Sequence, residues 1–197
     1  MILLDNLTHE EVKSIGGKIG EAFYDEGEGA FTRLDRADAI KVLEIMTECY
    51  YRMGVLYASS EHMEGYIAYW RKCEAKEWGV KMARASLHMT WRFLREIPIG
   101  SLKKLLPVLG NPYEKIYKKE KDYMVISMVA VCREFQGRGF LRVLLEEPFI
   151  AAKSRNIPCV LDTDTELKMK KYISCGMRKA AETPIKGGGT MYTMESD

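Results

Sequence analysis

The residues with the clearest chemical meaning form a short polar turn with two glycines, Gln136-Gly-Arg-Gly139. An uncharged run at 125–131 predicts a buried strand before the turn, and the apolar spacing over 140–149 predicts a helix after it, disturbed at Pro148. The first N–H groups of a helix have no intrahelical partner, and together with the helix dipole they favour a phosphate. Because glycines let the backbone come close to a ligand, the turn predicts a phosphate cradle.

Glycine spacing alone does not identify the ligand of this turn. Gly137-Arg-Gly139 lacks the third glycine of the dinucleotide fingerprint and the Lys-Ser/Thr ending of a P-loop. A plain strand-to-helix connection is therefore the alternative. Arg138 and Arg142 either assist phosphates or are ordinary surface residues.

Strand and turn together resemble a known coenzyme-binding motif. Val129-Ala-Val131 followed by Gln136-Gly-Arg-Gly139 is similar to the acetyl-CoA-binding motif of the GNAT superfamily of N-acetyltransferases, Gln/Arg-x-x-Gly-x-Gly/Ala. The resemblance implies that acetyl-CoA is the co-substrate and that its pyrophosphate contacts the turn. The coenzyme-binding residues that it implies are Val129, Ala130, Val131, Gln136, Gly137, Arg138, Gly139, Phe140, Leu141, Arg142 and Thr165.

A second stretch resembles the closing motif of the same superfamily. In that motif a strand ends in Leu-Glu-Thr, and the matching residues here are Leu161-Asp-Thr163. The motif continues with a helix that contains a tyrosine, which matches Lys171-Tyr-Ile-Ser-Cys-Gly-Met177. The resemblance implies that the hydroxyl of Tyr172 lies by the coenzyme sulfur and protonates the departing thiolate. Acetyl transfer also needs a group that takes the proton of the amine. The candidates for this base are Asp162 at the end of its strand and, in the predicted hairpin turn, Glu61 and Glu64.

Two positions depart from the family pattern and leave two functions open. Leu141 stands where the motif has Gly or Ala, and Thr165 stands where many relatives have Asn. The first function is transfer of an acetyl group from acetyl-CoA to a primary amine of a small molecule or peptide, by direct attack in a ternary complex. The alternative is an acyl-CoA-binding sensor without turnover, against which Tyr172 argues.

The remaining elements follow the GNAT order and predict a single acetyltransferase domain over 1–197. Helices are expected at 8–25 and 35–53, a hairpin at 55–60 and 65–70, and a first strand at 2–4. The resemblance implies an α/β (α+β) fold with a central mixed, mostly antiparallel sheet, splayed at the coenzyme A site and flanked by helices.

The segment at about 73–120 is a helical insertion between the hairpin and the coenzyme strand. Two helices are expected there, divided by Pro98 and Gly100, with a turn at Asn111-Pro112. Long insertions often cover a site. A solvated basic face over an ordinary apolar stripe is the simpler interpretation and is favoured over a substrate-recognition surface.

Charge and cysteine content limit the classes of partner. Residues 1–50 hold 11 acids and 5 bases, and residues 51–197 hold 17 acids and 25 bases, so the second part of the chain is basic. A basic region suits an anionic coenzyme. Nucleic acid is less favoured as a partner because acidic residues are interspersed among the Lys and Arg residues. The five cysteines and three histidines lack zinc spacing, so no metal is expected. Cys132 and Cys175 are weighed as nucleophiles, but packing is the favoured role because no His is arranged to activate them.

Without an expected signal peptide or membrane span, the free thiols indicate the cytoplasm. A homodimer is compatible with apolar residues in the insertion or a final strand edge.

Overall fold

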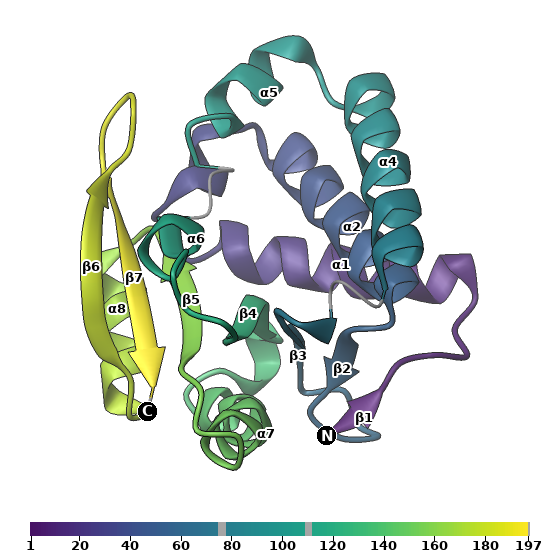
Figure 1. The fold of residues 1–197 in the computed structure, drawn as a ribbon. Helices are drawn as coiled ribbons and strands as arrows, with labels where there is room; N and C mark the ends of the chain where they lie inside the picture. Colours follow the sequence, from purple (N-terminus) through teal and green to yellow (C-terminus); the bar gives the residue numbers. More distant parts are fainter. Residues whose placement is uncertain (75–77, 109–111, 197) are drawn as a thin grey trace.

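The structure, a computed structural model, describes residues 1–74, 78–108 and 112–196 (Figure 1). Its centre is a seven-stranded sheet in the order β1-β2-β3-β4-β5-β7-β6. The β4–β5 pair is parallel and the other pairs are antiparallel, so the predicted mixed, mostly antiparallel sheet is confirmed. The strands are β1 (Ile2–Leu3), β2 (Leu56–Ala58), β3 (Gly65–Arg71), β4 (Met124–Val131), β5 (Cys159–Thr163), β6 (Arg178–Pro184) and β7 (Thr190–Ser196).

Helices cover both faces of the sheet. In Figure 1, α1, α2 and α4 lie above β2, β3 and β4, and α7 lies below them. The helix α8 lies beside β6 and β7 and contacts both. The helices are α1 (His9–Tyr24), α2 (Arg36–Met53), α4 (Gly79–Glu96), α5 (Ile99–Leu105), α6 (Pro112–Ile116), α7 (Phe140–Lys153) and α8 (Glu166–Ser174), with 3-10 turns η1 (Ala30–Arg33) and η2 (Arg133–Phe135).

The first two helices form a tightly packed pair. Thr8 and Glu11 make a reciprocal capping box at the start of α1, as their spacing predicts. Gly16 and Gly20 face α2, where an added Cβ would lie 2.6 Å from the Cα of Glu44 and 2.8 Å from the Cα of Ile40. Because a side chain at either glycine would push the helices apart, these glycines set the distance between α1 and α2.

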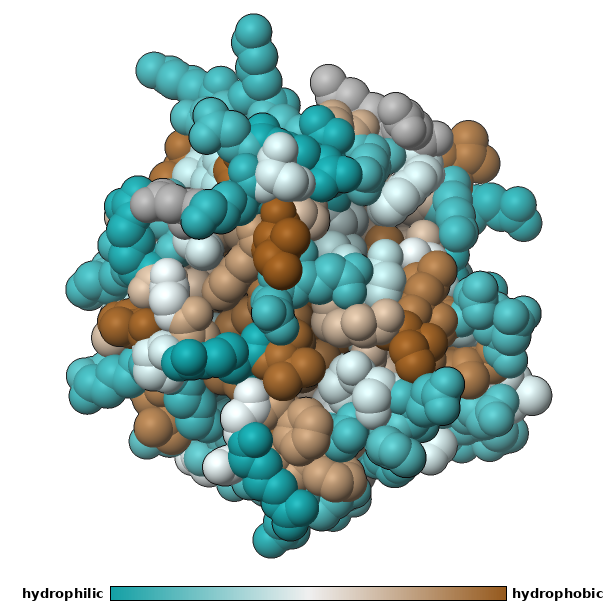
Figure 2. Space-filling model, turned by 90° about the horizontal axis from the view of Figure 1, so that it is seen from below, coloured by the Kyte–Doolittle hydropathy of each residue, from teal (hydrophilic) through white to brown (hydrophobic). Residues whose placement is uncertain are grey.

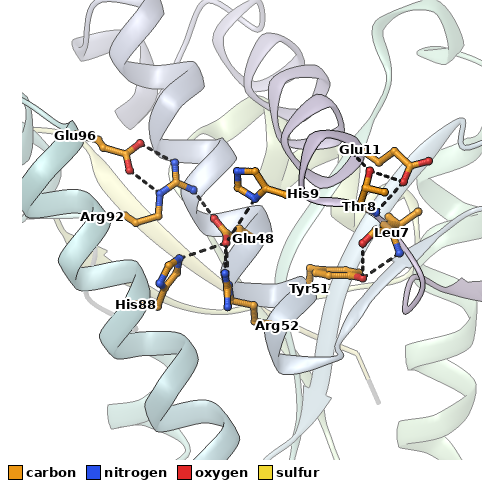
Figure 3. A network of polar contacts seen from close by, with 10 residues as sticks. All are labelled: Leu7, Thr8, His9, Glu11, Glu48, Tyr51, Arg52, His88, Arg92 and Glu96. Atoms are coloured by element: carbon orange, nitrogen blue, oxygen red, sulfur yellow. Dashed lines mark hydrogen bonds and ion pairs between the residues drawn. The ribbon is translucent and has the colours of Figure 1, made fainter.

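Helix α4 is attached to α2 by a buried carboxylate (Figure 3). Glu48 on α2 is 5% exposed and accepts hydrogen bonds from Arg52 and from Arg92 of α4. His88 Nε2 lies 3.2 Å from the same carboxylate, and Arg92 also binds Glu96 at 2.6 and 2.7 Å. A buried carboxylate costs free energy unless it is paired, and this network therefore fixes the position of α4 against α2.

The lower face of the molecule, where α7 lies in Figure 1, carries a mixed surface. Figure 2 shows apolar residues near the middle of this face, surrounded by hydrophilic ones. Within α7, Val143 is 44% exposed and Ile150 is 61% exposed, whereas Leu144 and Leu145 are fully buried. The two leucines therefore attach α7 to the sheet, and scattered exposed apolar residues of this kind are ordinary for a folded chain.

Four details differ from the sequence predictions or lie beyond them. The helix α7 continues through Pro148, which is buried within it, so burial outweighs the one backbone hydrogen bond that proline removes. Gly100 lies inside α5 and does not divide helices; Pro98 alone precedes that helix. The final strand β7 lies between β5 and β6 and is no sheet edge. Pro112 begins α6 where a turn was expected, and Asn111 lies outside the described residues.

Candidate active site

The strands β4 and β5 separate partway along their length. They pair through only two positions, Met124 with Cys159 and Val125 with Val160. Beyond that point β4 continues to Val131 and remains paired with β3 on its other side, while β5 pairs with β7. The sheet is therefore splayed between β4 and β5, as the family resemblance implied.

The backbone of β4 is directed into this gap at alternate residues. The Cys132 N–H donates to the Glu64 carbonyl at 2.8 Å, which fixes the phase of hydrogen bonding to β3. By strand alternation, the N–H groups of Val129 and Val131 face the opening between β4 and β5. The side-chain amide of Gln136 donates to the Val131 carbonyl at 3.2 Å, consistent with that direction. The gap thus offers backbone donors to a ligand.

The glycine turn leads into α7 with the backbone geometry of an anion site. Gly137 and Gly139 have φ of 75° and 86°, a region that favours glycine, and an added Cβ at either residue would meet no atom within 4 Å. These glycines are therefore required by backbone conformation and leave open space above the turn. No side chain of the described residues caps α7, so the first N–H groups of the helix point outward from Phe140.

A cavity of about 420 Å³ lies against this turn and is here called the coenzyme cavity. Basic Arg142, Lys168 and Lys171 outnumber the single acid Glu26 among its lining residues, which suits an anionic ligand. The other residues that line it are Ala22, Phe23, Val129, Ala130, Val131, Phe135, Gln136, Gly137, Gly139, Phe140, Leu141, Tyr172, Ser174 and Cys175.

Most of the predicted coenzyme-binding residues therefore lie together, but two do not line this cavity. Arg138 is exposed and its guanidinium lies over the Phe135 ring at 5.7 Å from the centroid. Thr165 is the N-cap of α8, where its hydroxyl accepts a hydrogen bond from the Lys168 N–H at 3.2 Å. Its position thus serves to begin the helix that carries Tyr172.

A second cavity, of about 500 Å³, adjoins the first and is here called the acceptor cavity. Four residues line both cavities, namely Phe23, Val129, Lys168 and Tyr172. Lys168 is held at this junction by Glu26 at 3.1 Å and Asp164 at 3.2 Å, and its ammonium lies over the Phe23 ring. Ligands bound in the two cavities would therefore meet beside Tyr172 and the backbone of Val129.

Tyr172 is buried at this junction and its hydroxyl stays protonated near neutral pH. Burial raises its pKa above the ordinary tyrosine value, and the nearby Glu26, Asp164 and Cys175 raise it further. Its helix α8 begins at the Thr165 cap, which fixes the position of the tyrosine two turns later. The side chain can therefore donate a proton or hydrogen bond to a group held between the cavities.

Asp162 lines the acceptor cavity and is a carboxylate of raised basicity. Burial raises its pKa to about 6, and the hydrogen bonds that it accepts oppose that shift without cancelling it. These bonds come from the Thr193 hydroxyl at 2.5 Å and the Tyr113 backbone N–H at 3.2 Å. Since a carboxylate has about four acceptor positions, Asp162 keeps capacity to accept a proton from a ligand.

The other candidate groups lie elsewhere. Glu61 is exposed, and Glu64 accepts bonds from the Ser59 and Ser60 hydroxyls, both at 2.7 Å, which lower its pKa. Neither lines either cavity. Burial raises the pKa of the Cys132 thiol, which disfavours the nucleophilic thiolate.

Several residues of the site had no assigned role in the sequence analysis. Lys168 lies one helical turn before Tyr172, so the i, i+4 spacing was a signal that both share one face. Phe23 lies within the helix expected at 8–25 and Glu26 lies just beyond it, and neither residue carries a local signal for a site. Their place at the junction depends on how α1 lies over the sheet, which local spacing does not encode.

Three solved structures resemble the whole chain. An N-acetyltransferase from Staphylococcus aureus Mu50 is 18% identical, with a TM-score of 0.57 over 97% of this chain and 98% of that one. Arylalkylamine N-acetyltransferase 2 from Aedes aegypti is 15% identical, with a TM-score of 0.56 over 96% and 95%. A polyamine N-acetyltransferase from Drosophila melanogaster is 10% identical, with a TM-score of 0.54 over 97% of each chain.

At the level of sequence, no protein-family model and no curated protein matches. The likeness in structure nevertheless spans nearly the full length, so the chain has the fold of the GNAT-type acetyltransferases that its motifs resemble. Within the described ranges, no helix has the length and apolar composition needed to cross a membrane. In those same ranges, no three His, Cys, Asp or Glu side chains are grouped to hold a metal ion.

Proposed function

We propose that this chain transfers the acetyl group of acetyl-CoA to a primary amine by direct attack in a ternary complex. The observation that carries the proposal is the junction of two cavities at Tyr172. One cavity has the glycine turn and excess basic charge that an acyl-coenzyme A ligand requires, and the other holds a half-buried carboxylate of raised pKa. Fold alone does not define activity, so the proposal depends on this site.

The chemistry divides between the two sides of the junction. Acetyl-CoA supplies an activated thioester, held by the α7 N-terminus and the backbone of Val129 and Val131. Asp162 takes a proton from the ammonium of the acceptor, directly or through water, and frees the lone pair of its nitrogen. The C–N bond then forms to give a tetrahedral intermediate, and its C–S bond breaks as Tyr172 gives its proton to the departing thiolate. The second proton of the attacking nitrogen leaves through water and restores the tyrosine hydroxyl, so the products are the amide and the free thiol of CoA. The Val129 N–H stabilises negative charge on the carbonyl oxygen.

The remaining parts of the proposal concern the domain organisation, the cellular compartment and the binding partners. We propose that 1–197 acts as one domain, in which α4 and α6 of the insertion contribute to the acceptor side. The five free cysteines support a reducing compartment such as the cytoplasm. Small-molecule or peptide amines are the acceptors, and neither nucleic acid nor a membrane takes part.

Calorimetric titration with acetyl-CoA and CoA, followed by thiol release against primary amines, tests the proposal. Saturable binding with amine-dependent thiol release supports acetyl transfer. Binding of acetyl-CoA without release from any amine would favour the acyl-CoA sensor instead. Absence of binding would refute the coenzyme site.

A further inference from the structure

The acceptor cavity differs from the coenzyme cavity in the chemistry of its walls. Its broad surface is apolar and rich in methionine and aromatic side chains, among them Met46, Tyr50, Trp70, Met82, Met89 and Phe93. These side chains come from α2, β3 and α4, which are separate elements of the chain. Methionine side chains adapt to irregular apolar shapes, so such walls suit hydrocarbon of varied outline.

Charged side chains gather at the β5 end of the acceptor cavity. Asp164 and Lys168 neutralise each other at 3.2 Å, and Asp164 also accepts a hydrogen bond from the Ala30 N–H. Glu114 is exposed. Asp162 is a half-buried carboxylate of this wall and accepts hydrogen bonds only from the neutral Thr193 hydroxyl and Tyr113 N–H among the described residues. A single ammonium therefore finds its counter-charge there.

Helix α4 supplies one wall through one of its faces. Met82, Met89 and Phe93 recur at helical spacing and line the cavity, whereas Leu87 lies on the other face and is 72% exposed. The ion pair of Arg92 with Glu48 holds this helix against α2 (Figure 3). The insertion is therefore a fixed apolar wall of the site, in addition to presenting an exposed basic surface.

We infer that the acceptor is a primary amine with one ammonium and an apolar body, aromatic or aliphatic. This inference rests on the proposed acetyl transfer and names its substrate class. The ammonium binds Asp162 at the junction, and the hydrocarbon body lies among Met46, Met89 and Trp70. A second ammonium on the far end of the acceptor would be buried against these walls without a partner, which is costly.

A matched pair of amines tests this inference. Hexylamine and 1,6-diaminohexane have the same chain length and differ by one terminal ammonium. We expect kcat/KM for hexylamine to exceed that for the diamine by at least about tenfold, because the diamine must bury an unpaired charge. Equal values, or a preference for the diamine, would overturn the inference while leaving acetyl transfer established.

A pair of variants on α4 sharpens the result. Met89→Glu places a carboxylate on the cavity wall and is expected to move the preference at least about tenfold toward the diamine. Leu87→Glu adds the same charge to the outer face and is expected to leave the preference unchanged. Calorimetric affinity for acetyl-CoA should be equal in both variants, because neither residue lines the coenzyme cavity. The same preference in both variants would contradict the proposed wall.

Direct binding separates this inference from the proposed function. Calorimetric titration of both amines into the CoA-loaded protein measures acceptor affinity without turnover. Tighter binding of hexylamine with no thiol release would refute acetyl transfer and retain the ligand class. Equal or undetectable binding of both amines would overturn the ligand class. The wild-type protein with the amine pair distinguishes these outcomes even if Met89→Glu fails to fold, which circular dichroism would reveal.

Discussion

The coenzyme cavity and the acceptor cavity meet at Tyr172 but are built in different ways. On the coenzyme side, one contiguous segment, 129–142, supplies the β4 edge, the glycine turn and the α7 N-terminus, and it offers mostly backbone N–H groups. On the acceptor side, side chains from α2, β3, α4, α6 and β5 converge. The coenzyme side should therefore be sensitive to backbone conformation, and the acceptor side to the identity of side chains.

The largest expected effect is loss of Asp162, the proposed base on the acceptor side. Asp162→Asn keeps one carbonyl oxygen, which accepts from either the Tyr113 N–H or the Thr193 hydroxyl, but it cannot take a proton. We expect kcat/KM for the amine to fall by roughly 10²–10⁴-fold, the usual contribution of a general base, with acetyl-CoA affinity unchanged. Steady-state kinetics and calorimetry measure both. Glu61→Gln in the hairpin is the control, and an equal loss there would transfer the role away from Asp162.

A substitution at Tyr172 tests the role of its hydroxyl at the junction of the two cavities. Tyr172→Phe removes the hydroxyl while keeping the ring, so we expect kcat to fall about 10²-fold and calorimetric affinity for acetyl-CoA to stay within about twofold. A fall in coenzyme affinity without a fall in kcat would show that the hydroxyl binds and does not donate a proton. Unchanged kinetics would remove Tyr172 from the mechanism.

Backbone conformation is the sensitive property on the coenzyme side. Gly139→Val forces a β-branched residue into positive φ at the turn, which costs about 1–2 kcal/mol, and we expect the calorimetric Kd for acetyl-CoA to rise about tenfold. Gly187 has φ of 95° in the turn between β6 and β7 and lines neither cavity. Gly187→Val should therefore lower stability similarly and leave coenzyme affinity unchanged.

The smallest expected effect is a change of stability with pH. The pKa of Asp162 is raised from 3.8 to about 6 in the folded state, so folding favours its protonated form. This contribution is fully present below pH 3.8 and is lost as the pH rises through about 6. Asp162→Asn should therefore be more stable than wild type by about 1–3 kcal/mol at pH 8 and nearly equal at pH 3.5, measured by urea unfolding.

The ionisation of Asp162 is also expected to determine how activity depends on pH. Because the base must be ionised, kcat/KM for the amine should fall as the pH drops below about 6, after correction for protonation of the free amine. A profile that stays flat down to pH 4.5 would contradict the assignment of Asp162.

The parts of the fold that were predicted correctly have local signals. The helices expected at 8–25 and 35–53 and the β2–β3 hairpin follow from neighbouring residues, such as the Thr8–Glu11 capping box that begins α1 and Gly54 that ends α2. Pro148 shows the limit of such rules, since a proline that should disturb a helix is retained inside α7 by tertiary burial. Gly100 likewise was expected to end a helix and lies within one.

The candidate site likewise has one part with local sequence signals and one part that depends on tertiary packing. The strand, the turn and the helix around Gly137 and Gly139 could be predicted because they are consecutive and local backbone rules determine their geometry, whereas coenzyme binding there stays a prediction. Thr165 illustrates a residue whose family position suggested coenzyme contact but whose side chain caps α8.

The sequence by itself determined the glycine turn, the order of the elements and the presence of Asp162 and Tyr172 at the ends of their strand and helix. Only the tertiary structure decided that Phe23, Lys168 and Tyr172 share a junction, that burial raises the pKa of Asp162, and that one face of α4 lines the second cavity. The physical reason is the distance along the chain over which each property is determined. Backbone conformation depends on adjacent residues, whereas burial and cavity shape depend on how distant elements pack.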